Sequence, residues 1–151
     1  MFDRLTEQSR QAFARANQFA RILDGDCITD ADVLLGIVHN YNCRAVCALQ
    51  CLGVDELSAL RSKLKELPRS TISLLVTGRL PQTRQAKAAI EVALRVADEM
   101  EHAKIETGHL LLGILSDPNT DAARCLAEVG VTFAKAQQVI GELIRTAPAE
   151  Q

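Results

Sequence analysis

Apolar residues recur every three or four positions along most of this chain, which is typical of amphipathic helices. Four segments of the first half follow this rule, at about residues 6–23, 29–39, 44–52 and 55–67. Four segments of the second half follow it again, at about residues 83–101, 106–115, 121–129 and 132–145. The second segment of each half is apolar on every side, so we expect both of these helices to be buried at the centre. The pattern predicts an all-α protein of eight helices.

The second half of the chain repeats the first. Gly113 follows Gly36 by 77 positions, and the apolar residues around the two glycines match at this offset. The repeat predicts two pseudo-twofold sets of four helices, which would bury their apolar faces on each other. We expect one domain, with repeat one at about 1–67, a linker at about 68–81, repeat two at about 82–145 and a frayed tail at 146–151. Residues 72–76 of the linker could form a strand, but no second strand is available to pair with it.

Two local features of the repeat have a direct physical interpretation. Thr6 and Thr83 each precede a long helix, where a hydroxyl can accept an otherwise unpaired backbone N–H of the first turn. Gly36 and Gly113 lie inside helices, where glycine costs about 1 kcal/mol relative to alanine. The repeated glycine therefore indicates close approach by another backbone.

Composition and charge narrow the functional classes. The chain has 151 residues, a formal net charge of −2 and only 3% aromatic residues. A sequence-independent nucleic-acid binder needs excess Lys and Arg and aromatic platforms, so that class is disfavoured. No apolar run is long enough to span a bilayer, and the N-terminus is too polar to begin a secretory signal. Five cysteines, an odd number, fit free thiols in a reducing compartment, so we expect a soluble, cytoplasmic monomer.

The cysteines and histidines are the only candidates for chemistry. Cys43, Cys47 and Cys51 form a stripe on one helix, but each step rises about 6 Å, so one continuous helix cannot bring all three to one zinc ion. A pair of these thiols with His39 remains possible, which leaves a thiol- or metal-dependent protein as an outside alternative. We interpret the cysteines mainly as small core residues, and His109 as a capping or inter-helix hydrogen-bonding residue. The sequence contains no phosphate-binding P-loop, so we expect neither an enzyme nor a cofactor.

The doubled pattern resembles the N-terminal domain of the Clp/Hsp100 unfoldases, most closely the ClpC branch. The resemblance covers almost the whole chain and is carried by Phe2, Arg4, Thr6, Ile28–Val38, Leu52–Val54, Thr83, Ala86–Lys87, Ile105–Leu115 and Gly130–Val131. It implies an all-α double repeat that performs no catalysis and docks adaptor proteins and unfolded or tagged substrates for a Clp ATPase and peptidase. The seam between the repeats is the implied surface. The residues that match the family's peptide- and adaptor-docking positions are Phe2, Thr6, Arg10, Thr83, Lys87 and Glu91.

This chain departs from the family pattern at three positions. Domains of the ClpC type that bind phosphoarginine carry a Glu where this sequence has Ala31 and Gly108, so we expect phosphoarginine binding to be weak or absent. Gln82 replaces an aromatic residue expected before the second-repeat threonine. Two roles remain open: a docking domain of a ClpC-like unfoldase, or a free-standing Clp-N protein that regulates a Clp complex. The particular adaptor or substrate is not indicated by the sequence.

Overall fold

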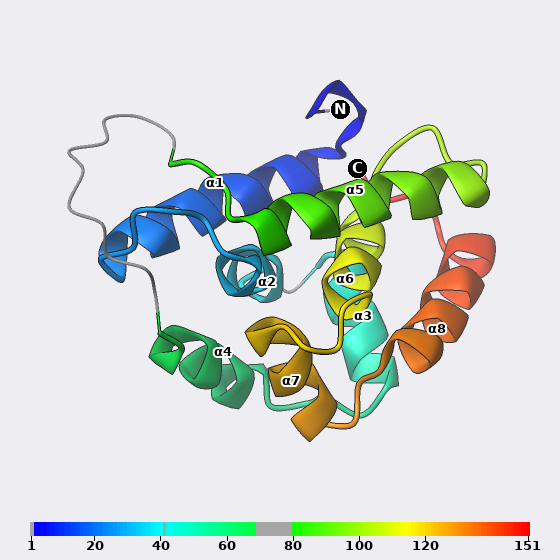
Figure 1. Ribbon diagram of the computed structural model, residues 1–151. Coiled ribbons are helices and arrows are strands. Elements are labelled where there is room, and N and C mark those ends of the chain that lie inside the picture. The colour runs from blue at the N-terminus through cyan, green and yellow to red at the C-terminus, as the bar shows by residue number, and fades with distance from the viewer. Residues whose placement is uncertain (1, 41, 69–79) are drawn as a thin grey trace.

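The computed structural model describes residues 2–40, 42–68 and 80–151, which form eight α-helices and one short 3-10 helix (Figure 1). The 3-10 helix is η1 (Phe2–Arg4), and the first repeat continues with α1 (Glu7–Ile22), α2 (Asp30–Val38), α3 (Arg44–Cys51) and α4 (Leu57–Glu66). The second repeat contains α5 (Arg84–Glu99), α6 (Thr107–Leu115), α7 (Asp121–Glu128) and α8 (Phe133–Thr146). The predicted all-α fold is confirmed. The expected linker and its possible strand fall largely on residues 69–79, outside the described part of the chain.

Helices α2 and α6 form the centre of the molecule, as their sequences predict. Every residue of both nine-residue helices is buried. Helices this short are marginal in water, so their stability comes from tertiary packing. In Figure 1, α1 and α5 run in opposite directions across one side of the molecule, above α2 and α6.

The glycines of the central helices allow the long helices to pack closely. A Cβ atom at Gly36 would overlap the carbonyl oxygen of Ala12 in α1, and one at Gly113 would overlap the carbonyl oxygen of Ala89 in α5. Backbone therefore approaches backbone at both places, which confirms the interpretation of the repeated glycine.

The short third helix of each repeat packs mainly on the other repeat. Helix α3 lies against α6 and α8, and α7 lies against α2 and α4 (Figure 1). The core of each repeat therefore includes a helix from the other repeat, so neither half has a complete core of its own.

Two short backbone pairings also join one repeat to the other. Leu5 pairs with Ile105, through the Thr6 N–H donating to Ile105 O (3.1 Å) and the Ile105 N–H donating to Arg4 O (2.8 Å). In the equivalent pairing, Ile28 meets Gln82. These bridges fix the start of each long helix against the opposite repeat.

The C-terminal segment differs from the sequence expectation. Helix α8 extends to Thr146, and residues 147–151 were expected to fray. Instead, this segment returns across the molecule, where the Glu150 carboxylate bonds to groups at the starts of α1, α3 and α6. Periodicity could not predict this course, because the segment has no helical pattern and is held by contacts distant in sequence.

Candidate functional site

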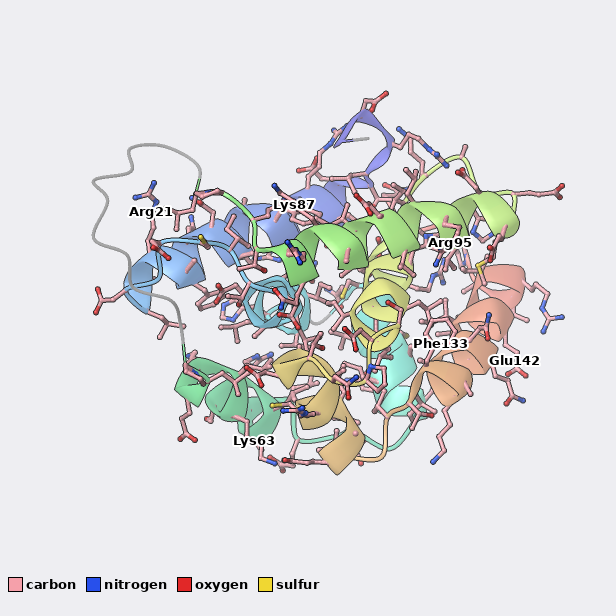
Figure 2. The ribbon with its side chains drawn as sticks, viewed as in Figure 1. Arg21, Lys63, Lys87, Arg95, Phe133 and Glu142 are labelled. Atoms are coloured by element: carbon pink, nitrogen blue, oxygen red, sulfur yellow. The ribbon has the colours of Figure 1, made fainter. Side chains whose placement is uncertain are left out.

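Five of the six predicted docking residues belong to the first turns of α1 and α5, or lie directly before them. Thr6 is buried, Thr83 is half-buried, and Arg10, Lys87 and Glu91 are exposed. Figure 2 shows Lys87 on the first turns of α5. The sixth, Phe2, lies in η1, and its side chain falls outside the part of the molecule that the structure describes.

Both threonines cap their helices. Thr6 Oγ1 accepts the Ser9 N–H at 3.2 Å, and Thr83 Oγ1 accepts the Ala86 N–H at 3.2 Å. The two threonines differ in their other surroundings. Thr6 also donates to a Glu150 carboxylate oxygen at 2.8 Å, whereas Thr83 lines an open cleft.

The open cleft has a volume of about 320 Å³ and collects residues from both repeats. Its lining is Thr29, Asp30, Ala31, Leu67, Pro68, Thr83, Gln85, Asn119, Thr120 and Asp121. We call it the Thr83 cleft. Lys87, one turn further along α5, and Glu91 do not line it. The structure therefore brings only Thr83, of the six predicted residues, into this cleft.

The Thr83 cleft is acidic. Asp30 is 8% exposed, and its Oδ2 atom has no hydrogen-bond partner within the described residues. Burial raises the pKa of Asp30, and the nearby Asp121 carboxylate adds to the rise, while hydrogen bonds such as that from Thr120 oppose it. A cationic group entering the cleft would relieve both the desolvation and the charge repulsion, so the chemistry of the lining favours a basic side chain.

Sequence reasoning missed Asp30 and Asp121. Each is the first residue of a helix, where an acidic side chain is already explained by the helix dipole. Only the exchange of α7 between the repeats brings the two carboxylates into one cleft.

The two positions where the sequence resemblance implied a Glu, Ala31 and Gly108, have different surroundings. Ala31 lines the Thr83 cleft. Gly108 is buried, and a Cβ atom there would lie 3.0 Å from Arg44 Cγ and 3.2 Å from Ile140 Cγ2. The Arg44 side chain therefore fills the space into which a Glu at position 108 would begin to project.

His109 makes the hydrogen bonds expected of a structural residue. Its Nδ1 atom accepts the Glu106 N–H at 2.9 Å, so the proton of the neutral ring is assigned to Nε2, which lies 3.0 Å from His102 Nδ1. Burial, and after it the nearby His102, together lower the pKa of His109 to about 4. The bond from the Glu106 N–H confirms the interpretation of His109 as a capping residue, and its second partner, His102, lies in the loop after α5.

The cysteine stripe is split between core and solvent. Cys43 is buried, whereas Cys47 and Cys51 are exposed, so the interpretation of these cysteines as core residues is wrong for two of the three. Helix α3 turns its Cys47 and Cys51 positions away from α6 and α8, an orientation that the spacing alone did not indicate. Among the residues that the structure describes, no three His, Cys, Asp or Glu side chains are placed to hold a metal ion. Nor does any described helix have the length and apolar character needed to cross a membrane.

The fold and the paired helix starts define an all-α double-repeat domain with a cleft between its repeats. Residues 81–151 match the family model of the Clp repeat (R) N-terminal domain. Chaperone protein ClpB of Oceanobacillus iheyensis is 31% identical over 144 residues, and the negative regulator of genetic competence ClpC/MecB of Bacillus subtilis is 30% identical over 149. Each alignment covers 95% of this chain and 17% of the relative.

Solved structures show the same fold. The N-terminal domain of the ClpD chaperone of Arabidopsis thaliana superposes with a TM-score of 0.74 at 18% identity, covering 96% of this chain and 97% of that one. A ClpV N-domain in complex with a VipB peptide gives 0.70 at 17% identity, covering 93% and 88%. The chain belongs to the Clp N-terminal domain family. It is similar to ClpB and ClpC to nearly the same degree, so the comparisons do not separate the ClpC branch from the ClpB branch.

Proposed function

We propose that this chain is a non-catalytic docking domain for adaptor proteins and for unfolded or tagged substrates of a ClpC-like ATP-dependent unfoldase and protease system. One observation carries the proposal: the Thr83 cleft, formed by both repeats at the start of a long helix, is open and has an unpaired buried carboxylate oxygen. A ClpV N-domain of the same fold has been solved with a peptide, which supports peptide docking as a use of this fold. Five free thiols support a cytoplasmic location.

The alternative role, a free-standing Clp-N regulator, shares this docking chemistry. The chain spans 17% of the length of its ClpB and ClpC relatives, and those lengths do not decide between the two roles. Capture of a Clp ring by the purified chain would favour the regulator. Capture of adaptors or client proteins without a ring would favour the docking domain.

Binding of a permanently unfolded protein tests the proposal directly. Fluorescence anisotropy with reduced, carboxymethylated lactalbumin would measure the affinity of the chain and of its variants. We expect the wild-type chain to bind, and no binding of this probe or of any adaptor would overturn the proposed function.

The predicted docking residues are tested by a paired comparison. Replacing Phe2 and Lys87 together by alanine should weaken binding without unfolding the domain. Arg95→Ala, an exposed residue two turns further along α5, is the matched control, and Figure 2 shows both basic side chains on that helix. Equal affinity of the double variant and the control would remove these residues from the site.

A further inference from the structure

The pseudo-equivalent of the Thr83 cleft, at the starts of α1, α3 and α6, is occupied by the chain's own residues 147–151. We call this segment the tail and the position it fills the Thr6 cleft. The Glu150 carboxylate accepts hydrogen bonds from the Thr107 N–H (2.8 Å), the Thr107 hydroxyl (2.5 Å), the Arg44 N–H (2.7 Å) and the Thr6 hydroxyl (2.8 Å). One side chain thus bonds to three helix starts.

The tail backbone is held in the same place. The Arg44 guanidinium donates to Pro148 O at 2.6 Å, the Glu150 N–H donates to Glu106 Oε1 at 3.3 Å, and the Gln8 N–H donates to Gln151 O at 3.1 Å. These are the contacts that an extended peptide makes in a binding groove.

The tail also lines two separate hollows. One has a volume of about 290 Å³ and the other about 370 Å³, and both are lined by Arg44, Ala149 and Glu150. Release of the tail would join the two spaces into one groove at the helix starts.

The two clefts differ at four equivalent positions, and three of these differences change charge. One places the Glu106 carboxylate, which pairs with Arg44 at 3.0 Å, where the first repeat has Thr29. At the start of α3, Cys43 makes no side-chain cap, whereas the equivalent Thr120 caps α7 through the Ala123 N–H. The first residue of α3 is Arg44 where α7 has Asp121, and the first of α6 is Thr107 where α2 has Asp30. Helix N-termini favour negative charge. The Thr6 cleft leaves these donors for an incoming carboxylate, whereas the Thr83 cleft supplies its own acids.

Nothing apolar anchors the tail. Pro148, Ala149 and Gln151 are exposed and Ala147 is half-buried, so the tail is held almost entirely by polar contacts. Another peptide with a suitably placed Glu or Asp could make the same bonds. The tail competes with it at the high effective concentration of an intramolecular ligand.

We propose that the tail is a removable, autoinhibitory occupant of the Thr6 cleft, which is a docking subsite for an acidic side chain in an extended peptide. The inference deepens the proposed function and rests on it only for the identity of the competing peptide. While the tail is in place, the Thr83 cleft is open and the Thr6 cleft is masked.

The test uses a fluorescein-labelled peptide with the tail's own sequence, Ala-Pro-Ala-Glu-Gln, and the full 151-residue chain. Anisotropy titrations compare wild type, Glu150→Ala and the control Glu142→Ala, whose exposed side chain projects from α8 (Figure 2). We expect the peptide to bind Glu150→Ala at least tenfold more tightly than wild type or the control. A peptide with Gln in place of Glu should lose this binding. Equal affinities for all three chains would overturn the inference.

Amide resonances provide a readout that is independent of affinity. Amide protons bonded to a carboxylate resonate downfield, so the Thr107 and Arg44 N–H signals should move upfield in Glu150→Ala and return when the peptide saturates the cleft. Unchanged signals in the variant would show that Glu150 does not occupy the cleft. A dispersed spectrum of Glu150→Ala would establish that the variant is folded.

Unfolded lactalbumin separates the two proposals. Tighter lactalbumin binding by Glu150→Ala than by Glu142→Ala would support masking, and equal binding would refute it. If lactalbumin and adaptors bind none of the chains while the tail peptide still binds Glu150→Ala, the proposed docking function fails and the tail's role as occupant stands.

Discussion

Replacing Gly113 by alanine tests the close approach of α5 and α6. A Cβ atom there would overlap Ala89 O and would lie 2.9 Å from Ala89 C and 3.2 Å from Ala93 N. All three atoms are backbone, so no side-chain rotation can relieve the overlap and the two helices must separate. The pseudo-equivalent Gly36 meets Ala12 and Ala16 of α1 in the same way.

The expected magnitude is a balance of two opposing effects. Alanine gains about 1 kcal/mol of helix propensity over glycine. Overpacking a well-packed core costs about 1–3 kcal/mol and more where the obstacle is rigid, and separating α5 from α6 also opens gaps among their buried contacts. Because the obstacle is backbone, the cost should lie at or above the upper end of that range, about 3 kcal/mol, so we expect a net loss of about 2 kcal/mol or more in the free energy of unfolding for Gly113→Ala.

Gly141 in α8 is the matched control. A Cβ atom at Gly141 would meet no atom within 4 Å, so Gly141→Ala should stabilise the domain by about 0.5–1 kcal/mol. Urea unfolding followed by circular dichroism at 222 nm measures both variants against wild type. The reasoning would be refuted if Gly113→Ala proved as stable as Gly141→Ala.

Three further predictions concern buried charge and exposed thiols. Because the pKa of buried His109 is lowered to about 4, the unfolded chain binds this proton first as the pH falls. Above about pH 6.5, His109 therefore makes its full contribution to the free energy of unfolding, and this contribution declines by about 3 kcal/mol by about pH 4. His109→Asn should remove this part of the pH dependence, as measured by urea titrations at several pH values. The Arg44 guanidinium lies 3.0 Å from the Glu106 carboxylate, and both side chains are less than 10% exposed. Arg44→Met leaves that carboxylate buried without its cation and should cost about 3–5 kcal/mol in chemical denaturation, and adding Glu106→Gln should recover part of the loss. A thiol reagent should label Cys47 and Cys51 rapidly in the native chain and all five cysteines after unfolding, as counted by intact mass; rapid labelling of buried Cys43 would contradict the packing of α3.

Local patterns determined most of the secondary structure. Helix positions followed from apolar spacing, and Thr6 and Thr83 were identified as caps because the bond between a capping hydroxyl and the first turn is local. Two helix boundaries differ by two residues: α5 ends at Glu99 rather than Glu101, and α4 begins at Leu57 rather than Asp55. Its N-cap, Glu56, makes no side-chain capping bond to the backbone, so the sequence had no capping signal to place that start.

The repeat also determined part of the tertiary structure. Two all-apolar segments had to be central, and a glycine at the same place in each of them indicates backbone contact from the sequence alone. Both inferences hold because burial and close approach each restrict residue type at the position concerned.

The candidate site depended on contacts that the sequence pattern does not encode. The exchange of α3 and α7 between the repeats brings Asp30 beside Asp121 in one cleft and Arg44 beside Thr107 in the other. The alignment of the two repeats shows that equivalent positions differ in charge. Only the packing of α3 and α7 on the opposite repeat gathers these residues into two clefts of different charge.

The tail shows most clearly what the sequence pattern could not predict. Nothing in the composition of residues 147–151 indicates order, since they have no helical pattern and bury no large apolar side chain. Only the tertiary structure provides the three helix starts that hold Glu150, from segments more than 40 residues away along the chain. Helices and caps follow from neighbours in sequence, whereas the placement of a carboxylate at a shared cleft depends on where distant backbone donors converge.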